Sequence, residues 1–362
     1  MLSRVMVLEE FNKPLVEKEV EIPQLSSGEV LVKISASGVC GSDVHMWKGE
    51  DPRTPLPIVL GHEGVGEIVE INGSKKTVDG IELKTGDTIL WNRGITCGKC
   101  FYCKVARQPF LCEDRKVYGI NISFNEHPHL NGCYSEYIVL RHNTDVFKIP
   151  KDIDPAIIVN ASCSGATAAH GFDIIKPGNG DVVVIQGPGP VGIFSVAFAK
   201  ACGVKEIVVI GGTQKRLDLC REFGATRILN RHETTREDRK QAIFELTRGR
   251  GADYVIEAAG YPQALREGLG LVRPGGTYLS MGFAQPMGSI EFDGYSDLVR
   301  KNIRIMGVWV SDTRHTFQAM NLVLSNPEAF EKMISHRYPL LKANEALRAM
   351  DNKEALKAVL IP

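Results

Sequence analysis

The alternation of apolar and polar residues changes character near the middle of the chain. Up to about Pro150, short β-branched runs are punctuated by glycine, and these runs predict a β-rich, barrel-like half. The expected strands cover residues 30–34, 64–71, 87–90 and 137–140. We therefore expect the first part of the chain to fold as a β-domain.

From Asp181 onward, strand-like runs alternate with helical ones. The expected strands are 182–185, 206–210, 254–257 and 277–281, and the expected helices are 191–201, 215–223 and 262–271. This alternation predicts a parallel sheet with helices on both faces. A strand-like run at 303–310 and a helical run at 344–350 follow, and we expect the last part of the chain to return to the first domain.

Size and charge narrow the classes of function. A chain of 362 residues exceeds what one hydrophobic core usually supports, so two domains are expected. The 43 basic residues balance 43 acidic ones, which argues against nucleic acids and anionic membranes as partners and favours small molecules. The first residues do not resemble a signal peptide, and no run approaches the ~18 apolar residues of a membrane span. Nine cysteines, most at metal-type spacing, suit a reducing compartment, so we expect a cytoplasmic protein.

Four cysteines cluster in one short segment. They are Cys97, Cys100, Cys103 and Cys112. Four thiolates can close a tetrahedral shell around Zn²⁺ with no position left for water, so the spacing predicts a structural zinc site. A redox cysteine pair and chance clustering are the alternatives. An iron-sulfur cluster fits less well, because its fourth cysteine usually follows after about three residues and precedes a proline.

A glycine-rich turn links an apolar strand to an apolar helix. Its pattern is Gly187-Pro-Gly189-Pro190-Val191-Gly192. In this setting the first glycine permits a tight turn, the second lets backbone approach a pyrophosphate, and the third lets the helix pack on the strand. The alternative is an ordinary glycine-rich turn, but the strand before and the helix after it predict dinucleotide binding.

The end of the second strand of this domain indicates which nucleotide fits. An acidic residue there would bind the ribose 2′-hydroxyl group and repel a 2′-phosphate, and this chain has none. The residues found instead are Gly211, Gly212, Thr213, Lys215, Arg216 and, after the next strand, Arg231. Small residues make room and cations can pair with phosphate, so we favour NADP(H) over NAD. The alternative for Lys215 and Arg216 is a solvated helix face.

A second metal site is expected in the first half. Cys40 and His62 each follow or precede a predicted strand, and they can supply two ligands to a zinc ion that keeps one position open for substrate. The third ligand must come from elsewhere. Cys163 is the best candidate, whereas Cys133 is a weaker one. The remaining cysteines fall inside apolar helices, where a buried thiol is expected.

Taken together, these motifs resemble the zinc-containing medium-chain alcohol and polyol dehydrogenases over nearly the whole chain. The resemblance rests on the order of an upstream cysteine, Gly61-His-Glu63, the four-cysteine lobe and the late glycine turn. It implies an α/β protein with a GroES-like catalytic domain at 1–160, a structural zinc lobe at about 93–115, a Rossmann coenzyme domain at 161–305 and a return to the catalytic domain at 306–362. It further implies a substrate cleft between the domains and a homodimer or homotetramer.

The resemblance also implies roles for individual residues. Cys40, His62 and Cys163 would bind a catalytic zinc ion, with Glu63 beside or transiently on the metal, while Asp43 would orient His62. In polyol-type members the third ligand is often acidic, and here it is Cys163. The four lobe cysteines would bind the second, structural zinc.

A proton relay completes the expected mechanism. Zinc would act as a Lewis acid on the alcohol while hydride passes to the nicotinamide ring. Ser42 would accept the alcohol proton and His45 would pass it towards solvent. The alternatives are a helix-capping serine and a surface histidine.

Substrate identity is left open by these motifs. The polar segment 113–132 is longer than expected for such a link, and its His127 and His129 fit a solvated loop better than a substrate site. Further substrate contacts are expected near Trp47 and Trp309. We expect a secondary alcohol of the polyol, sugar acid or hydroxy acid type. The alternatives are a zinc-free enone or quinone reductase of the same superfamily and a non-catalytic, nucleotide-sensing zinc protein.

Overall fold

The computed structural model describes residues 1–362, which form two compact units. The first, called the terminal unit here, contains Met1–Cys163 and Ser311–Pro362. The second, called the central unit, contains Ser164–Val310. The division between them falls after Cys163 rather than at residue 160, so Cys163 belongs to the same unit as Cys40 and His62.

The terminal unit is built on three sheets. The largest has seven strands in the order β10-β6-β5-β3-β18-β17, with β9 also paired to β3. Its strands are β3 (Val30–Val39), β5 (Gly64–Ile71), β6 (Thr88–Trp91), β9 (Tyr137–Leu140), β10 (Val146–Lys148), β17 (His336–Pro339) and β18 (Ala358–Ile361). The two smaller sheets consist of β1 (Leu2–Leu8), β2 (Val16–Glu21) and β4 (Ile58–Val59), and of β7 (Gly94–Ile95) and β8 (Lys116–Val117).

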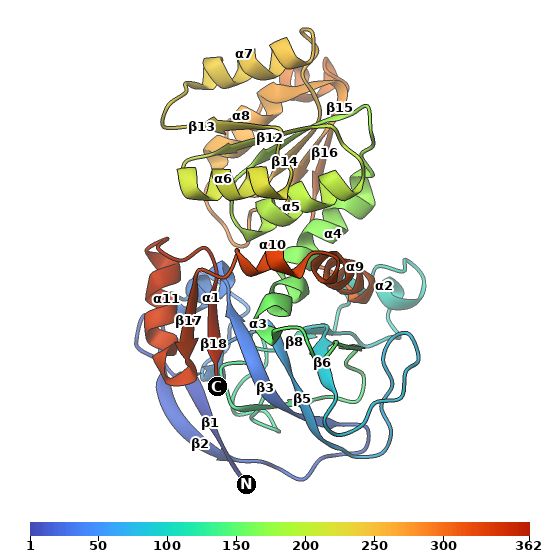
Figure 1. Ribbon diagram of the computed structural model, residues 1–362, viewed down its shortest axis with the longest axis vertical. Coiled ribbons are helices and arrows are strands. Elements are labelled where there is room, and N and C mark those ends of the chain that lie inside the picture. The colour runs from blue at the N-terminus through green and yellow to red at the C-terminus, as the bar shows by residue number, and fades with distance from the viewer. The chain divides into compact units, whose positions relative to one another are not determined.

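The end of the chain lies beside its beginning in this unit. Strand β18 runs antiparallel to β3, with Ala358 opposite Val39 and Leu360 opposite Ser37. Strands β3, β5 and β18 are seen side by side in Figure 1. Most residues of β3 and β18 are buried, so the pairing joins two apolar strands in the interior.

Short helices surround these sheets. They are α1 (Gly41–Trp47), α2 (Phe101–Lys104), α3 (Pro155–Ile158), α9 (Thr313–Leu324), α10 (Pro327–Glu331) and α11 (Ala343–Asp351). Three 3₁₀ turns accompany them at Pro109–Leu111, Val159–Ser162 and Leu340–Lys342. Helix α1 starts directly after β3, because Cys40 leaves the strand in an extended conformation and the side chain of Asp43 accepts a hydrogen bond from the Cys40 amide.

The central unit is a six-stranded parallel sheet in the order β13-β12-β11-β14-β15-β16. Its strands are β11 (Val182–Gln186), β12 (Glu206–Gly211), β13 (Arg227–Asn230), β14 (Ala252–Glu257), β15 (Val272–Ser280) and β16 (Arg304–Gly307). Its helices are α4 (Ser164–Ile175), α5 (Pro190–Ala201), α6 (Gln214–Phe223), α7 (Arg236–Leu246) and α8 (Pro262–Leu271), with a π-helical turn at Gly294–Val299.

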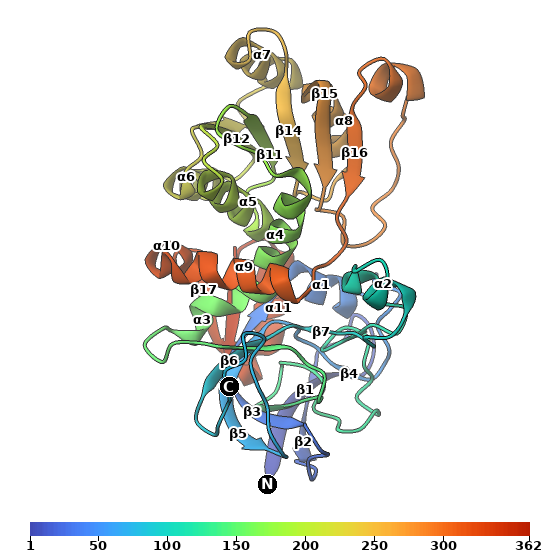
Figure 2. The same ribbon diagram turned by 90° about the vertical axis from the view of Figure 1, so that its right-hand side faces the viewer.

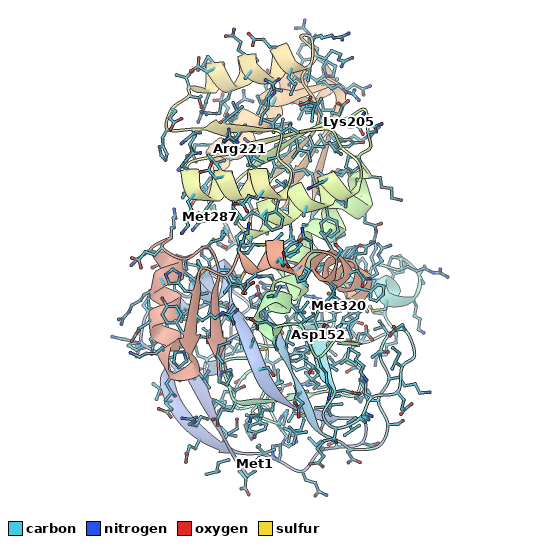
Figure 3. The ribbon with its side chains drawn as sticks, viewed as in Figure 1. Met1, Asp152, Lys205, Arg221, Met287 and Met320 are labelled. Atoms are coloured by element: carbon cyan, nitrogen blue, oxygen red, sulfur yellow. The ribbon has the colours of Figure 1, made fainter.

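Helices cover both faces of this sheet. Figures 1 and 2 show α5 and α6 on one face and α7 and α8 on the other. All five residues of β11 are buried, as expected for a strand enclosed on two sides. Charged residues of the same unit, such as Lys205 and Arg221, are exposed at its surface (Figure 3). This arrangement confirms the expected Rossmann-type parallel sheet.

Several predicted elements match the observed ones, and others were missed. Strands β5 and β9 and helix α8 have the expected bounds. Strands β1 and β2 and helix α7 were not predicted. Helix α7 is mostly polar, and Arg239 and Ile243 are its only buried residues, so it lacks a clear apolar stripe. All helices are too short or too polar to cross a bilayer.

Candidate metal centres and nucleotide turn

Four potential metal ligands converge in the terminal unit. Cys40 lies between β3 and α1, His62 and Glu63 directly precede β5, and Cys163 follows the 3₁₀ turn Val159–Ser162. Their ligand atoms all lie within 4.8 Å of one another. Three separate segments therefore bring two thiols, an imidazole and a carboxyl group to one point, as the sequence predicts.

The hydrogen bonds around His62 fit a metal ligand. Its Nδ1 atom lies 3.1 Å from Asp43 Oδ1, whereas its Nε2 atom is buried and has no hydrogen-bond partner. Glu63 Oε1 is likewise buried and unpartnered. Buried polar atoms normally find a partner, so these two orphaned atoms beside two thiols indicate a position for a cation. An imidazole fixed by a carboxylate at its other nitrogen is typical of zinc sites.

Charges in the cluster depend on one another. Burial opposes a charge on the His62 ring, but the Asp43 carboxylate outweighs it and raises the pKa of His62 to about 9. A hydrogen bond from Cys163 lowers the pKa of the Cys40 thiol, and the two sulfur atoms are 3.9 Å apart. A metal ion bound here would therefore displace a proton from the His62 ring. It would also bind Cys40 as a thiolate, the form that the hydrogen bond from Cys163 already stabilises.

Asp43 holds this arrangement in place. It is fully buried and accepts hydrogen bonds from the Cys40 amide at 2.7 Å and from the Tyr134 hydroxyl group at 3.2 Å, in addition to its contact with His62. The aspartate thus links the start of α1 to the segment before β5. Its position agrees with the orienting role that the resemblance implies.

Two buried cations border the cluster, and sequence reasoning missed both. The Lys357 ammonium group donates to Glu63 Oε2, and Arg93 Nη1 donates to Cys163 Sγ at 2.6 Å. Arg93 is 5 % exposed and Lys357 is 1 % exposed. Lys357 stands alone among apolar residues just before β18, and that isolation is a signal of a buried lysine. Arg93 carries no comparable signal.

The expected relay residues lie on α1. Ser42 Oγ is 3.8 Å from Cys40 Sγ, so the hydroxyl group lies next to the cluster. His45 is three residues further along the same helix face, and its Nδ1 atom is 2.5 Å from Glu50 Oε2. The structure therefore brings Ser42 to the metal ligands and gives His45 an acidic partner that the sequence analysis did not name.

The four-cysteine lobe forms a second ligand group. The Sγ atoms of Cys97, Cys100, Cys103 and Cys112 lie within 4.8 Å of one another. Cys97 Sγ accepts the Cys100 amide hydrogen at 3.4 Å, and Cys112 Sγ accepts the Cys97 amide hydrogen at 3.3 Å. Backbone amide groups of Glu113 and Cys103 lower the pKa of Cys100 to about 6. Helix α2 has no buried residue, so this lobe lacks a core of its own and fits a metal-held segment.

The glycine turn of the central unit has the geometry expected for a nucleotide-binding turn. Gly187 has a φ angle of 104°, which favours glycine. A Cβ atom on Gly192 would overlap the Gly187 carbonyl oxygen, so α5 can pack closely only with glycine there. Gly189 is the N-cap of α5, and a Cβ atom there would meet open space. Pro190 and Val191 begin the helix, and the first amide groups of a helix have no acceptor within the helix itself.

The end of β12 lies beside two further basic side chains. A Cβ atom on Gly212 would lie 2.6 Å from Arg231 Nε and 2.8 Å from His232 Nε2. Thr213 follows as the N-cap of α6, after Gly211 at the end of the strand. His232 was not predicted, although it directly follows Arg231 in the chain.

The two basic residues at the start of α6 differ in their surroundings. Lys215 is exposed, which agrees with a solvated helix face as much as with a phosphate contact. Arg216 is half-buried, and burial lowers the pKa of its guanidinium group.

The other residues named from the sequence lie outside both ligand groups. Cys133 is fully buried in the hydrophobic core, where a Cβ atom on Gly64 would touch it. His129 Nδ1 is 2.7 Å from the Phe124 carbonyl oxygen, and His127 is exposed in the same loop. The Trp47 indole donates to the Lys13 carbonyl oxygen at 2.6 Å, and Trp309 is 44 % exposed in the central unit.

Comparisons with known proteins agree with this geometry. Residues 26–151 match the alcohol dehydrogenase GroES-like domain, and residues 190–325 match the zinc-binding dehydrogenase domain. A 5-exo-hydroxycamphor dehydrogenase from Pseudomonas putida is 34% identical over 349 residues, 94% of both chains. An alcohol dehydrogenase structure from Thermotoga maritima is 50% identical with a TM-score of 0.97 and covers 100% of each chain.

A structure of a putative zinc-binding dehydrogenase from Sinorhizobium meliloti, bound to NADP, is also similar, at 27% identity and a TM-score of 0.86 over 100% of each chain. Two matched domains, a curated relative along almost the whole chain and the two ligand groups all agree. The chain is therefore a zinc-dependent oxidoreductase of alcohols and belongs to the zinc-containing medium-chain dehydrogenase/reductase family.

Proposed function

We propose that this protein interconverts a secondary alcohol and its ketone, with NADP(H) as the hydride carrier and a catalytic zinc ion on Cys40, His62 and Cys163. The observation that carries the proposal is the orphaned Nε2 atom of His62, buried beside two thiols and held from behind by Asp43. A second zinc ion on the four lobe cysteines would have a structural role.

The residues around the site hold the metal ligands in place and orient them. When bound, the zinc ion supplies a Lewis acid that makes the alcohol hydroxyl group easier to deprotonate. Asp43 fixes the His62 ring so that Nε2 faces the cluster. Lys357 holds one oxygen of Glu63, which leaves the other free for transient contact with the metal. Three protein ligands then leave a position for substrate.

Ser42 and His45 supply a path for the substrate proton. Ser42 lies beside Cys40, where its hydroxyl group can accept a proton from the substrate and pass on its own. His45 follows on the same face of α1, and its contact with Glu50 orients the ring. Imidazole is the side chain that exchanges protons most readily with solvent at neutral pH, which suits the last step of the relay.

The coenzyme preference rests on the end of β12. No carboxylate occupies that position, whereas Arg231 and His232 lie against Gly212. Cations there can pair with a 2′-phosphate group. The similar Sinorhizobium meliloti dehydrogenase is bound to NADP, which supports the same choice. The pyrophosphate would lie at the N-terminus of α5, between Gly187 and Gly192.

Metal analysis combined with coenzyme-linked assays tests the proposal. We expect two zinc ions per chain, turnover of ketones with NADPH and a lower KM for NADPH than for NADH. The variants Cys40→Ser and His62→Ala should each lose one zinc ion and turnover but keep NADPH binding, as followed by fluorescence. Full activity in either variant would contradict the site. One zinc ion per active chain would favour the zinc-free reductase, and bound NADPH without any turnover would favour the nucleotide sensor.

We also infer a cytoplasmic homo-oligomer. All nine cysteines are free thiols, which suits a reducing compartment. Strand β16 is at the edge of the central sheet, and its Ile305 is 41 % exposed, so a second copy of the chain could continue the sheet there. Sedimentation velocity of the wild type and of Ile305→Lys would test this, since the charge should shift the assembly towards monomer.

A further inference from the structure

Arg93 is a buried cation with spare hydrogen-bonding capacity beside the metal ligands. Its Nη1 atom donates to Cys163 Sγ at 2.6 Å, but its Nε atom is buried and has no partner. Arg93 forms no ion pair with a carboxylate. A zinc ion would neutralise the two cluster thiolates, so they would not balance the guanidinium charge as well.

Arg115 provides a second cation next to the first. Its guanidinium group lies over Gly94, where a Cβ atom would be 2.7 Å from Cζ and 2.8 Å from Nε. Gly94 directly follows Arg93 in the chain, and burial and the charge of Arg93 both lower the pKa of Arg115, so the two guanidinium groups lie near enough to repel each other. Its Nε atom is also buried without a partner, and the only hydrogen bond of the side chain is a long one of 3.5 Å to the Ser311 carbonyl oxygen.

The charges of Cys163, Cys40 and Glu63 favour the charged form of Arg93, whereas the acidic groups near Arg115 have basic partners of their own. Asp51 binds Arg53 at 2.9 Å, and Asp312 lies 2.9 Å from His315 Nδ1 at the start of α9. Burial, together with the charges of Arg93 and Arg53, lowers the pKa of the Arg115 guanidinium group. Each guanidinium group has a buried Nε atom without a hydrogen-bond partner, and an anion bound between the two groups would supply acceptors to both and reduce their repulsion. A guanidinium fork matches carboxylate and phosphate oxygens in geometry.

From these positions we infer that Arg93 and Arg115 bind an oxyanion on the substrate, so the alcohol is a hydroxy acid, a sugar acid or a phosphorylated polyol and not a neutral alcohol. The inference rests on the proposed function, because it places the anion next to the zinc-bound end of the same substrate. Arg93 and Arg115 are then residues that determine specificity, and the charge of the substrate decides which alcohols react.

Matched substrates test the inference. Three pairs differ mainly in charge: D-gluconate and D-sorbitol, D-sorbitol 6-phosphate and D-sorbitol, and 3-hydroxybutyrate and 2-butanol. We expect kcat/KM to be at least about 100-fold higher for an anionic member than for its neutral partner, as for a pair of charge-assisted hydrogen bonds. The first and second pairs distinguish carboxylate from phosphate. A neutral compound as the best substrate would overturn the inference.

Variants of Arg93 and Arg115 test whether these two residues cause the preference for anionic substrates. Arg115→Gln should raise KM for the anionic substrate about 10- to 100-fold and change the neutral partner less than about twofold. Arg93→Lys keeps the positive charge, so its kcat/KM for the anionic substrate should fall less than that of Arg93→Gln. The control is Arg337→Gln, because Arg337 is an exposed arginine of the same unit that pairs with Asp154. A raised KM for NADPH instead of the substrate would show that the arginines bind coenzyme phosphate, and would overturn the inference.

Direct binding gives a readout that does not require turnover. Calorimetric titration of the zinc-loaded protein with acetate and with inorganic phosphate should show binding that is about tenfold weaker in Arg115→Gln at unchanged zinc content. Equal binding by both proteins would contradict the inference. If neutral alcohols react and anionic ones do not, only this inference fails. If no alcohol or ketone reacts although both zinc ions are present, the proposed function fails.

Discussion

The ammonium group of Lys357 donates a hydrogen bond to the carboxylate of Glu63, and both side chains are almost completely buried. The pair lies over Gly38, where a Cβ atom would overlap Glu63 Oε2 and come within 3.0 Å of Lys357 Nζ. The Gly38 amide also donates to the Glu63 carbonyl oxygen at 2.9 Å. Three segments of the terminal unit therefore meet at one ion pair next to the metal ligands.

Removing one partner of this pair should be strongly destabilising. Lys357→Met leaves the Glu63 carboxylate buried without a counter-charge, and we expect the free energy of unfolding to fall by about 3–5 kcal/mol. Urea denaturation followed by circular dichroism measures the change. The double variant Lys357→Met with Glu63→Gln should recover part of the loss. Lys342→Met, which removes an exposed pair with Glu345, is the control and should change stability little.

Asp43→Asn should weaken zinc binding without removing a ligand. The amide cannot accept hydrogen bonds from the Cys40 amide, the Tyr134 hydroxyl group and His62 as a carboxylate does. Loss of such a partner typically lowers metal affinity about 10- to 100-fold. Competition with a chromogenic chelator measures this affinity. Tyr134→Phe removes a single contact and should have a smaller effect, so an equal loss in both variants would argue against the orienting role of Asp43.

The lobe should depend on metal for its structure. Cys103→Ser should reduce the zinc content by one ion per chain and lower the melting temperature, since helix α2 has no buried side chain to hold it. Limited proteolysis near Phe101, which is 59 % exposed, should become faster. The matched control is Cys202→Ser. Cys202 was expected to be a buried helix residue, but it follows the last residue of α5 and is exposed, so its replacement should leave zinc content and melting temperature unchanged.

Gly192→Ala should affect coenzyme binding and leave the metal centres intact. The added Cβ atom would overlap the Gly187 carbonyl oxygen and move the start of α5 away from the turn. We expect NADPH to bind at least about tenfold more weakly, measured by its fluorescence, with unchanged zinc content. Gly178→Ala adds the same methyl group where there is open space, so it should behave as the wild type. Equal NADPH affinity in both variants would show that NADPH binding does not require the close packing of α5 against the Gly187 turn.

Ser42→Ala should slow turnover much more than it weakens binding. Removing a group that transfers a proton costs about 10²- to 10⁴-fold in rate, and the hydroxyl group lies next to Cys40. His45→Gln should have a milder effect, which exogenous imidazole should partly reverse. Stopped-flow measurement of NADPH formation separates the rate from KM. An unchanged kcat in Ser42→Ala would remove this serine from the relay.

Residues of rare type and regular spacing were predictable from the sequence, and buried charges were not. Cys40, His62 and Cys163 were found because thiols and imidazoles beside strand ends are typical metal ligands, and the structure brings them together. Arg93 was missed because an arginine in a loop usually faces water, and only the folded chain shows its contact with Cys163. Burial depends on what lies across the fold, and a local pattern contains no information about those distant segments.

The antiparallel pairing of β18 with β3 has a consequence for biosynthesis. These strands are separated by almost the whole chain, and the central unit is inserted between them. During translation the central unit, which is continuous in sequence, can fold before β18 has been synthesised, so β3 has β5 and β9 beside it but lacks β18 until later. We therefore expect the largest sheet of the terminal unit to be completed late, because β18 links both itself and β17 to β3.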